Sequence, residues 1–209
     1  MPDGGIGEDF LHVAGLAQVS VGNGTMRPFL LVGIENSQRR RDLTGPTESA
    51  EDRKIAPKVG GSAAFRSFLR TELMPAVKAR YRTTAETAIV GESLAGLFVI
   101  ETVLVEPELF DTSIAFDPSL WWNSEELGKS AGDRLRATGT RLRTLYLASS
   151  SEKELSRLTQ QFADVLGQDA PASRTWHHHP MPAETHATIY HPAALAAFRR
   201  PFAPAPDAR

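Results

Sequence analysis

The stretch that decides the fold is Ala88-Ile89-Val90-Gly91-Glu92-Ser93-Leu94-Ala95-Gly96-Leu97-Phe98-Val99-Ile100. A short apolar run ends at Gly91, a serine follows two residues later, and small residues open a second apolar run that continues to Leu104. This order predicts a buried strand, a sharp turn and a helix, with Ser93 at the apex of the turn. Small residues must flank the serine because strand and helix pass within contact distance there.

Ser93 stands in a near match to the pattern G-x-S-x-G, in which Ala95 takes the last place and Gly96 follows it. That pattern marks a nucleophile elbow, the strained turn that presents the catalytic serine of α/β-hydrolases. The alternative interpretation is a buried strand that turns into a helix with an ordinary N-cap serine. A pentapeptide alone is only a hypothesis, so the rest of the chain has to decide.

The composition is that of an ordinary globular protein. The chain has 209 residues, 41% of them hydrophobic and 23% charged, with a formal net charge of -2. We expect one domain over residues 1–202 and a flexible tail over residues 203–209. Nothing in the charge balance favours nucleic acid or an anionic membrane as a partner. The lack of cysteine excludes disulfides, thiolate catalysis and zinc-thiolate sites.

The sequence gives no sign of a membrane or export segment. No apolar run is long enough to span a bilayer, and the N-terminus lacks the basic and apolar regions of a signal peptide. We therefore expect a cytoplasmic protein.

Predicted strands and helices alternate along the chain. We expect strands over residues 29–34, 87–90, 110–116, 142–148 and 174–179, and helices over residues 10–19, 62–80, 97–104, 152–166 and 191–202. Pro75 should kink or break the helix in which it lies, and residues 35–61 form a long polar loop without clear periodicity. The alternation predicts an α/β fold with a mostly parallel sheet and helices on both faces. Ser93, Asp117, Glu152 and His186 all follow strands, at the edge where such sheets gather their active groups.

Four segments carry a resemblance to a known family. They are VGIENSQRRRDLTGP (32–46), GGSAAFRSFLRTELMP (60–75), AIVGESLAGLFVIE (88–101) and AFDPSLWWN (115–123). Together they resemble the esterase family of α/β-hydrolases that includes S-formylglutathione hydrolase (esterase D) and the enterochelin-type siderophore esterases, the second branch more closely. The resemblance runs from about Asp3 to Phe198 and implies hydrolysis of carboxylic esters without a metal or organic cofactor.

The start of the chain departs from that family. The family's "DGG" loop follows a central strand, whereas here Met1-Pro2-Asp3-Gly4-Gly5 begins the chain. An N-terminally shortened fold is therefore expected, with a strand missing between residues 29–34 and 87–90. Either these strands close up, or a second chain covers the sheet, or the sequence is a shortened version of a longer protein. An exposed edge favours a homodimer through the sheet.

The serine needs a base, because an unassisted hydroxyl is a weak nucleophile. His186, in Glu184-Thr185-His186, follows the last predicted strand, where this architecture places its histidine, and it matches the family's histidine motif. His191 is the rival, although it precedes a proline and looks like a helix start. Residues His177 to His179 lie within one strand and point alternately to opposite faces, which argues against a metal site.

A third group is expected to orient His186 and stabilise its charged form. Glu152 is favoured because it comes soon after a strand, with Glu154 as an alternative. Asp117, which follows an earlier strand, is a further candidate, although an Asp before Pro more often shapes a turn. Some siderophore esterases of the family work with a Ser–His pair and no clear acid, so a missing third member is also compatible with the resemblance.

The remaining site residues are an oxyanion hole and a substrate pocket. The backbone amide of Leu94 is one oxyanion donor, and the resemblance implies a second from the glycine loop, at Gly5 or Gly4. Trp121 and Trp122 are expected to wall the pocket or else to pack in the core. The resemblance also implies that arginines bind an anionic aromatic ligand, for which residues 39–41 are candidates, Arg41 among them unless it pairs with Asp42.

The sequence thus predicts a serine esterase acting on small-acyl or siderophore-type esters through an acyl-enzyme. The alternatives are an acyltransferase on the same fold, and a catalytically impaired hydrolase fold that serves as a binding module.

Overall fold

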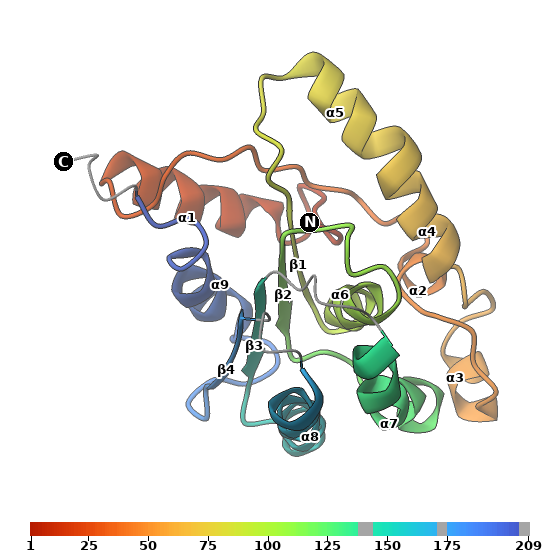
Figure 1. Cartoon of the computed structure of the whole chain (residues 1–209). Helices are drawn as coiled ribbons and strands as arrows, with labels where there is room; N and C mark the ends of the chain where they lie inside the picture. The colour runs from red at the N-terminus through yellow and green to blue at the C-terminus, as the bar shows by residue number, and fades with distance from the viewer. Residues whose placement is uncertain (138–143, 171–174, 205–209) are drawn as a thin grey trace.

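A computed structural model describes residues 1–137, 144–170 and 175–204 of the chain. Its centre is a parallel sheet of four strands in the order β1-β2-β3-β4 (Figure 1). The strands are β1 (Ala88–Glu92), β2 (Thr112–Phe116), β3 (Thr144–Ser149) and β4 (Thr175–Pro180). Helices α6 (Leu94–Val105), α7 (Trp122–Ala137) and α8 (Lys153–Asp169) connect them, and α9 (Tyr190–Phe198) follows β4. The predicted α/β class is confirmed.

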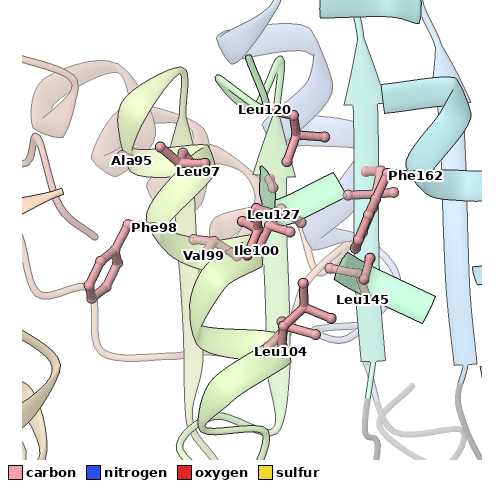
Figure 2. Close-up of a cluster of buried hydrophobic side chains, with 14 of the residues drawn as sticks. Ala95, Leu97, Phe98, Val99, Ile100, Leu104, Leu120, Leu127, Leu145 and Phe162 are labelled. Atoms are coloured by element: carbon pink, nitrogen blue, oxygen red, sulfur yellow. The ribbon is translucent and has the colours of Figure 1, made fainter. Parts of the chain in front are cut away.

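Helices cover both faces of the sheet (Figure 1). Helix α1 (Phe10–Gly22) and α9 lie on one face, and α6 and α8 lie on the other. Successive side chains of β1 alternate accordingly, since Ile89 joins the core on the α6 side and Val90 joins the core against α1 and α9. Figure 2 shows the larger core, where Ile100 of α6, Leu145 of β3 and Phe162 of α8 approach one another.

Residues 29–34 are not the strand that their apolar run predicts. Within the described residues, the only strand-like pairing of this segment is an isolated parallel bridge between Pro2 and Ile34, and Leu30 is 47% exposed. A groove of about 350 Å³ is lined both by this segment and by β1, with Leu31 and Ile89 among its lining residues. The run stays irregular because a strand needs a neighbour to pair with. The groove lies where the sequence predicts a missing strand.

The predicted helix over residues 62–80 is present, with an interruption before Pro75. It consists of α4 (Ser62–Phe68), a π-helical stretch η1 (Leu69–Leu73) and α5 (Met74–Arg80). Proline has no amide hydrogen to donate to the preceding turn. The ladder widens just before it, so that the Met74 amide bonds the Leu69 carbonyl five residues back.

Residues 35–61 contain two short helices, α2 (Arg39–Asp42) and α3 (Ala50–Ile55), although they show no periodicity in the sequence. Tertiary contacts hold this segment. The indole Nε1 of Trp122 donates to the carbonyl of Gly45 at 3.0 Å, and the amide of Asn123 donates to Asp52 at 2.7 Å.

The N-terminal glycine loop packs directly on residues 33–36. The Gly4 amide donates to the Ile34 carbonyl at 2.9 Å, and the Asp3 amide donates to the Asn36 side chain at 2.9 Å. A Cβ atom on Gly33 would lie 2.2 Å from the Gly4 oxygen, so this approach requires glycine.

The expectation of one domain over residues 1–202 stays a prediction. The expectation of a flexible tail over residues 203–209 also stays a prediction, since residues 205–209 lie outside the described residues. In the described part of the chain, no helix is both long and apolar enough to cross a bilayer.

Candidate active site

Ser93 occupies a strained turn between β1 and α6. Its backbone angles are φ 58° and ψ −120°, a conformation that costs energy for a residue with a side chain. An ordinary N-cap residue has extended angles and a capping hydrogen bond from its side chain. Ser93 has neither of these features, so the geometry favours the nucleophile elbow over the N-cap interpretation.

The strand can approach the helix closely at this turn because Gly91 has no side chain. A Cβ atom at this position would lie 2.6 Å from the Cβ of Ala95. The strand and the helix therefore touch between these two residues, and only one of them can carry a side chain. This explains how alanine is accommodated in the last place of the G-x-S-x-G pattern.

The loop after β2 supports the elbow. The Ser93 amide donates to the Phe116 carbonyl at 3.0 Å, and the Ser119 amide donates to the Ser93 carbonyl at 3.0 Å. The two serine hydroxyls lie 3.4 Å apart. Ser119 is buried and Ser93 is half-buried, so the Ser93 hydroxyl rests against a fixed polar neighbour.

His186 is paired with Asp117. Its Nδ1 atom lies 3.1 Å from the Asp117 Oδ2 atom, and the other carboxylate oxygen accepts the Ser150 amide at 2.7 Å. Asp117 is fully buried, whereas the His186 side chain is 40% exposed. The hydrogen bond with Asp117, assisted by the negative charges of Glu92 and Asp117, raises the pKa of His186 against the opposing effect of burial. With Nδ1 engaged, Nε2 remains to exchange a proton with a substrate or nucleophile.

The expectation that Glu152 contacts His186 is wrong. Glu152 is the exposed N-cap residue of α8, and Glu154 lies in the first turn of that helix. The sheet register explains why Asp117 is better placed. Glu92 and Phe116 are partners in adjacent strands, so Ser93 and Asp117 leave the sheet side by side. In the sequence, the signal for this acid is an aspartate directly after a strand, although an aspartate before a proline more often shapes a turn.

The other histidines have different partners. His191 approaches His12, with Nδ1 atoms 3.3 Å apart. His178 bonds Ser149 and His179 bonds Tyr146, both of β3, on opposite faces of the sheet. No group of three or more His, Cys, Asp or Glu side chains within the described ranges could hold a metal ion.

One predicted oxyanion donor is available and the other is occupied. Leu94 is the first residue of α6, where backbone amides have no partner within the helix. The Gly5 amide donates to the Glu8 carboxylate at 2.6 Å, and the Gly4 amide is bonded to Ile34. The Gly5 amide can meet a substrate oxygen only if the Glu8 carboxylate gives way.

The predicted substrate-binding residues differ in their exposure and in their hydrogen-bond partners. Trp122 is 4% exposed and anchors the Gly45 loop, while Trp121 is half-buried beside it, with ring centroids 6.0 Å apart. Arg41 is bonded to Asp42 at 2.7 Å. Arg39 instead bonds Asp3 at 2.8 Å and interacts electrostatically with His186. Within the run of three arginines, it is therefore Arg39 that acts on the site.

Comparison with known proteins is consistent with this geometry. A family model described as "Putative esterase" matches residues 2–191. The chain belongs to this family.

Members with curated names resemble parts of the chain. Ferri-bacillibactin esterase BesA of Bacillus subtilis is 35% identical over 111 residues, which are 50% of this chain and 36% of that protein. Siderophore triacetylfusarinine C esterase of Aspergillus fumigatus is 39% identical over 90 residues, which are 41% of this chain and 29% of that protein. The aligned stretches thus span about a third of these curated relatives.

The fold matches solved structures more completely. The crystal structure of an IroE-like serine hydrolase from Shewanella oneidensis aligns with a TM-score of 0.83 and 26% identity, covering 96% of this chain and 68% of that one. The α/β-hydrolase-like arrangement of this esterase-family chain is therefore shared with a serine hydrolase.

Proposed function

We propose that this protein is a serine esterase that cleaves carboxylic esters through an acyl-enzyme. The observation that carries the proposal is the hydrogen bond from His186 to the buried Asp117, beside the strained turn of Ser93. Asp117 takes the role that was expected of Glu152. A hydroxyl at an elbow, an imidazole and a buried carboxylate are the groups that acyl transfer requires.

The reaction follows from these positions. Ser93 Oγ attacks the ester carbonyl while its proton passes to Nε2 of His186. Asp117 stabilises the resulting imidazolium through Nδ1. His186 then gives the proton to the departing alcohol, and a water molecule, deprotonated by His186, hydrolyses the acyl-enzyme.

The oxyanion formed in both steps needs backbone donors. We assign the amide of Leu94 as the first donor and that of Gly5 as the second, after displacement of Glu8. Positive charge from Arg39 and the aromatic face of Trp121 suit an anionic or aromatic ester. The contacts of Arg41 and Trp122 favour structural roles for those two side chains.

Small-acyl and siderophore-type esters are the proposed substrates. Relatives whose names refer to siderophore esters support the second class. The decisive experiment measures hydrolysis of p-nitrophenyl acetate by the wild type and by Ser93→Ala. We expect the variant to lose about 10³-fold or more in kcat/KM, since residual catalysis comes from binding and the oxyanion hole alone. Equal rates in the two proteins would overturn the proposal.

A fluorophosphonate probe separates an enzyme from a binding module. The occupied Gly5 amide is the observation that favours an impaired site. Labelling that disappears in Ser93→Ala supports the esterase, whereas an unlabelled but folded wild type supports the binding module. Product analysis with an added alcohol distinguishes hydrolysis from transfer to that alcohol.

We also propose a homodimer formed through the open edge of β1. This edge faces the apolar groove, and unpaired strand edges are templates for pairing with another chain. Sedimentation equilibrium tests the proposal, and a monomer at all concentrations contradicts it. A cytoplasmic location remains a prediction that cell fractionation can test.

A further inference from the structure

Glu92 is a half-buried residue whose carboxyl group the proposed mechanism does not use. It is the last residue of β1 and directly precedes Ser93. Its Oε1 atom is buried and has no hydrogen-bond partner among the described residues. The Oη atom of Tyr190 and the Oδ1 atom of Asp3 share this condition. A polar atom buried without a partner costs about 1–3 kcal/mol, so a purely structural role does not account for Glu92.

Charged groups from several elements interact electrostatically with this carboxyl. His186, from the loop before α9, and Arg39 of α2 contribute attractive charge. Asp117, after β2, and Asp9, just before α1, contribute repulsive charge. Burial is the largest effect and raises the pKa of Glu92 to about 7.

Tyr190 of α9 belongs to the same environment. The charges of Glu92, Asp9 and Asp3 act on its phenol, and its pKa is raised well above the ordinary value, chiefly by burial. Tyr190 is 6% exposed. Partial burial of this kind strengthens electrostatic interactions relative to those in bulk water.

The interaction between Glu92 and His186 is reciprocal. His186 is the largest of the charges that favour the ionised form of Glu92, and the Glu92 charge favours the protonated form of His186. Two carboxyl groups therefore act on His186. Asp117 holds it by a hydrogen bond, and Glu92 acts on it by charge from the strand that carries the nucleophile.

We propose that Glu92 is a positioning residue that acts through His186, stabilising the imidazolium formed when Ser93 loses its proton. This inference rests on the proposed esterase function. When Ser93 Oγ bonds to the ester carbon, its proton moves to His186, and the negative charges of Asp117 and Glu92 both favour the new positive charge. Glu92 itself forms no bond with the substrate.

The test compares Glu92→Gln, which keeps the shape and removes the charge, with Glu152→Gln, an exposed carboxyl outside the His186 pair. Imidazole NMR signals give the pKa of His186 directly, and the pH profile of kcat/KM on p-nitrophenyl acetate gives its effect on catalysis. We expect Glu92→Gln to lower the pKa of His186 and to move the acid limb of the profile to lower pH. Above pH 8, kcat should fall by about tenfold, as expected for losing roughly one pKa unit of imidazolium stabilisation. Glu152→Gln should change neither readout.

Other outcomes distinguish the two proposals. If Ser93-dependent activity exists but Glu92→Gln leaves both the titration and kcat unchanged, the role of Glu92 is wrong and the esterase stands. If no Ser93-dependent activity exists, the esterase and the catalytic role of Glu92 both fail. Glu92→Asp keeps the charge and should keep the pKa of His186 raised. A loss in Glu92→Asp equal to that in Glu92→Gln would indicate packing rather than charge and overturn the inference.

Discussion

The Nδ1 atom of His186 lies 3.1 Å from the Oδ2 atom of Asp117, although 69 residues separate the two in the chain. Asp117 leaves the sheet next to Ser93 because β1 and β2 pair in parallel, with Glu92 opposite Phe116. Its other carboxylate oxygen is held by the Ser150 amide, which fixes the orientation of the group. The acid of the proposed triad thus comes from the strand adjacent to the nucleophile.

Asp117→Asn should reduce kcat strongly, because an amide neither stabilises the imidazolium nor holds the correct tautomer of His186. A loss of about 10³–10⁴-fold is expected for hydrolysis of p-nitrophenyl acetate. The matched control is Glu152→Gln, which should retain wild-type activity. If the control loses activity and Asp117→Asn does not, the acid is Glu152 after all.

The pH dependence of activity should report His186. Its pKa is raised, mainly by the hydrogen bond with Asp117, and general-base catalysis needs the neutral ring. Activity should therefore rise with pH through a midpoint above the ordinary histidine value of about 6.5. In Asp117→Asn the midpoint should move to lower pH. A wild-type midpoint below that of the variant would contradict the assignment.

The raised pKa of His186 also affects stability, which should fall as pH rises, whereas activity should increase. Because the folded state binds the His186 proton more tightly than the unfolded state, this contribution is fully present below the unfolded pKa. It is lost as pH rises through the raised folded pKa. Chemical denaturation across this range should show a smaller decline in the free energy of unfolding for His186→Gln than for the wild type. An equal decline in the two proteins would show that His186 makes no such contribution.

Glu8→Ala should increase kcat/KM. The Glu8 carboxylate accepts the Gly5 amide at 2.6 Å and competes with the developing oxyanion for that donor. The control is Glu35→Ala, which removes a second carboxylate next to the same glycine. The Glu35 Cγ atom would lie 3.2 Å from a Cβ atom placed on Gly5. With p-nitrophenyl acetate as substrate, kcat/KM should increase in Glu8→Ala and stay unchanged in Glu35→Ala. A fall in kcat for Glu8→Ala would mean that Glu8 shapes the loop and that Gly5 is not a donor in competition with it.

Gly91→Ala should destabilise the protein, because the added methyl group would lie 2.6 Å from the Ala95 Cβ. Overpacking of this kind costs about 1–3 kcal/mol. The control is Gly128→Ala in α7, where an added Cβ meets no atom within 4 Å. That change should stabilise the helix by about 0.5–1 kcal/mol. Urea denaturation measures both, and equal stabilities would show that the elbow has more room than the structure indicates.

The sequence by itself predicted the four strands of the sheet and Ser93 as the proposed nucleophile. Local patterns were sufficient for Ser93, since apolar runs, small residues and a serine define a strand–turn–helix within one short stretch. His186 was also found from order along the chain, because parallel α/β folds place such groups after strands. Residues 29–34 show the limit of this reasoning, since an apolar run becomes a strand only where a neighbour offers backbone partners.

Only the tertiary structure decided which carboxylate bonds His186 and which group already occupies the Gly5 amide. Glu152 and Asp117 both follow strands, and the pairing register of β1 with β2, a property of two distant segments, separates them. The same holds for the bond between Glu8 and Gly5, for the bond of Arg39 with Asp3, and for the electrostatic interaction of Glu92 with His186. The physical reason is that hydrogen bonds and charge interactions depend on distances of a few ångströms, which folding sets and which spacing along a chain does not encode.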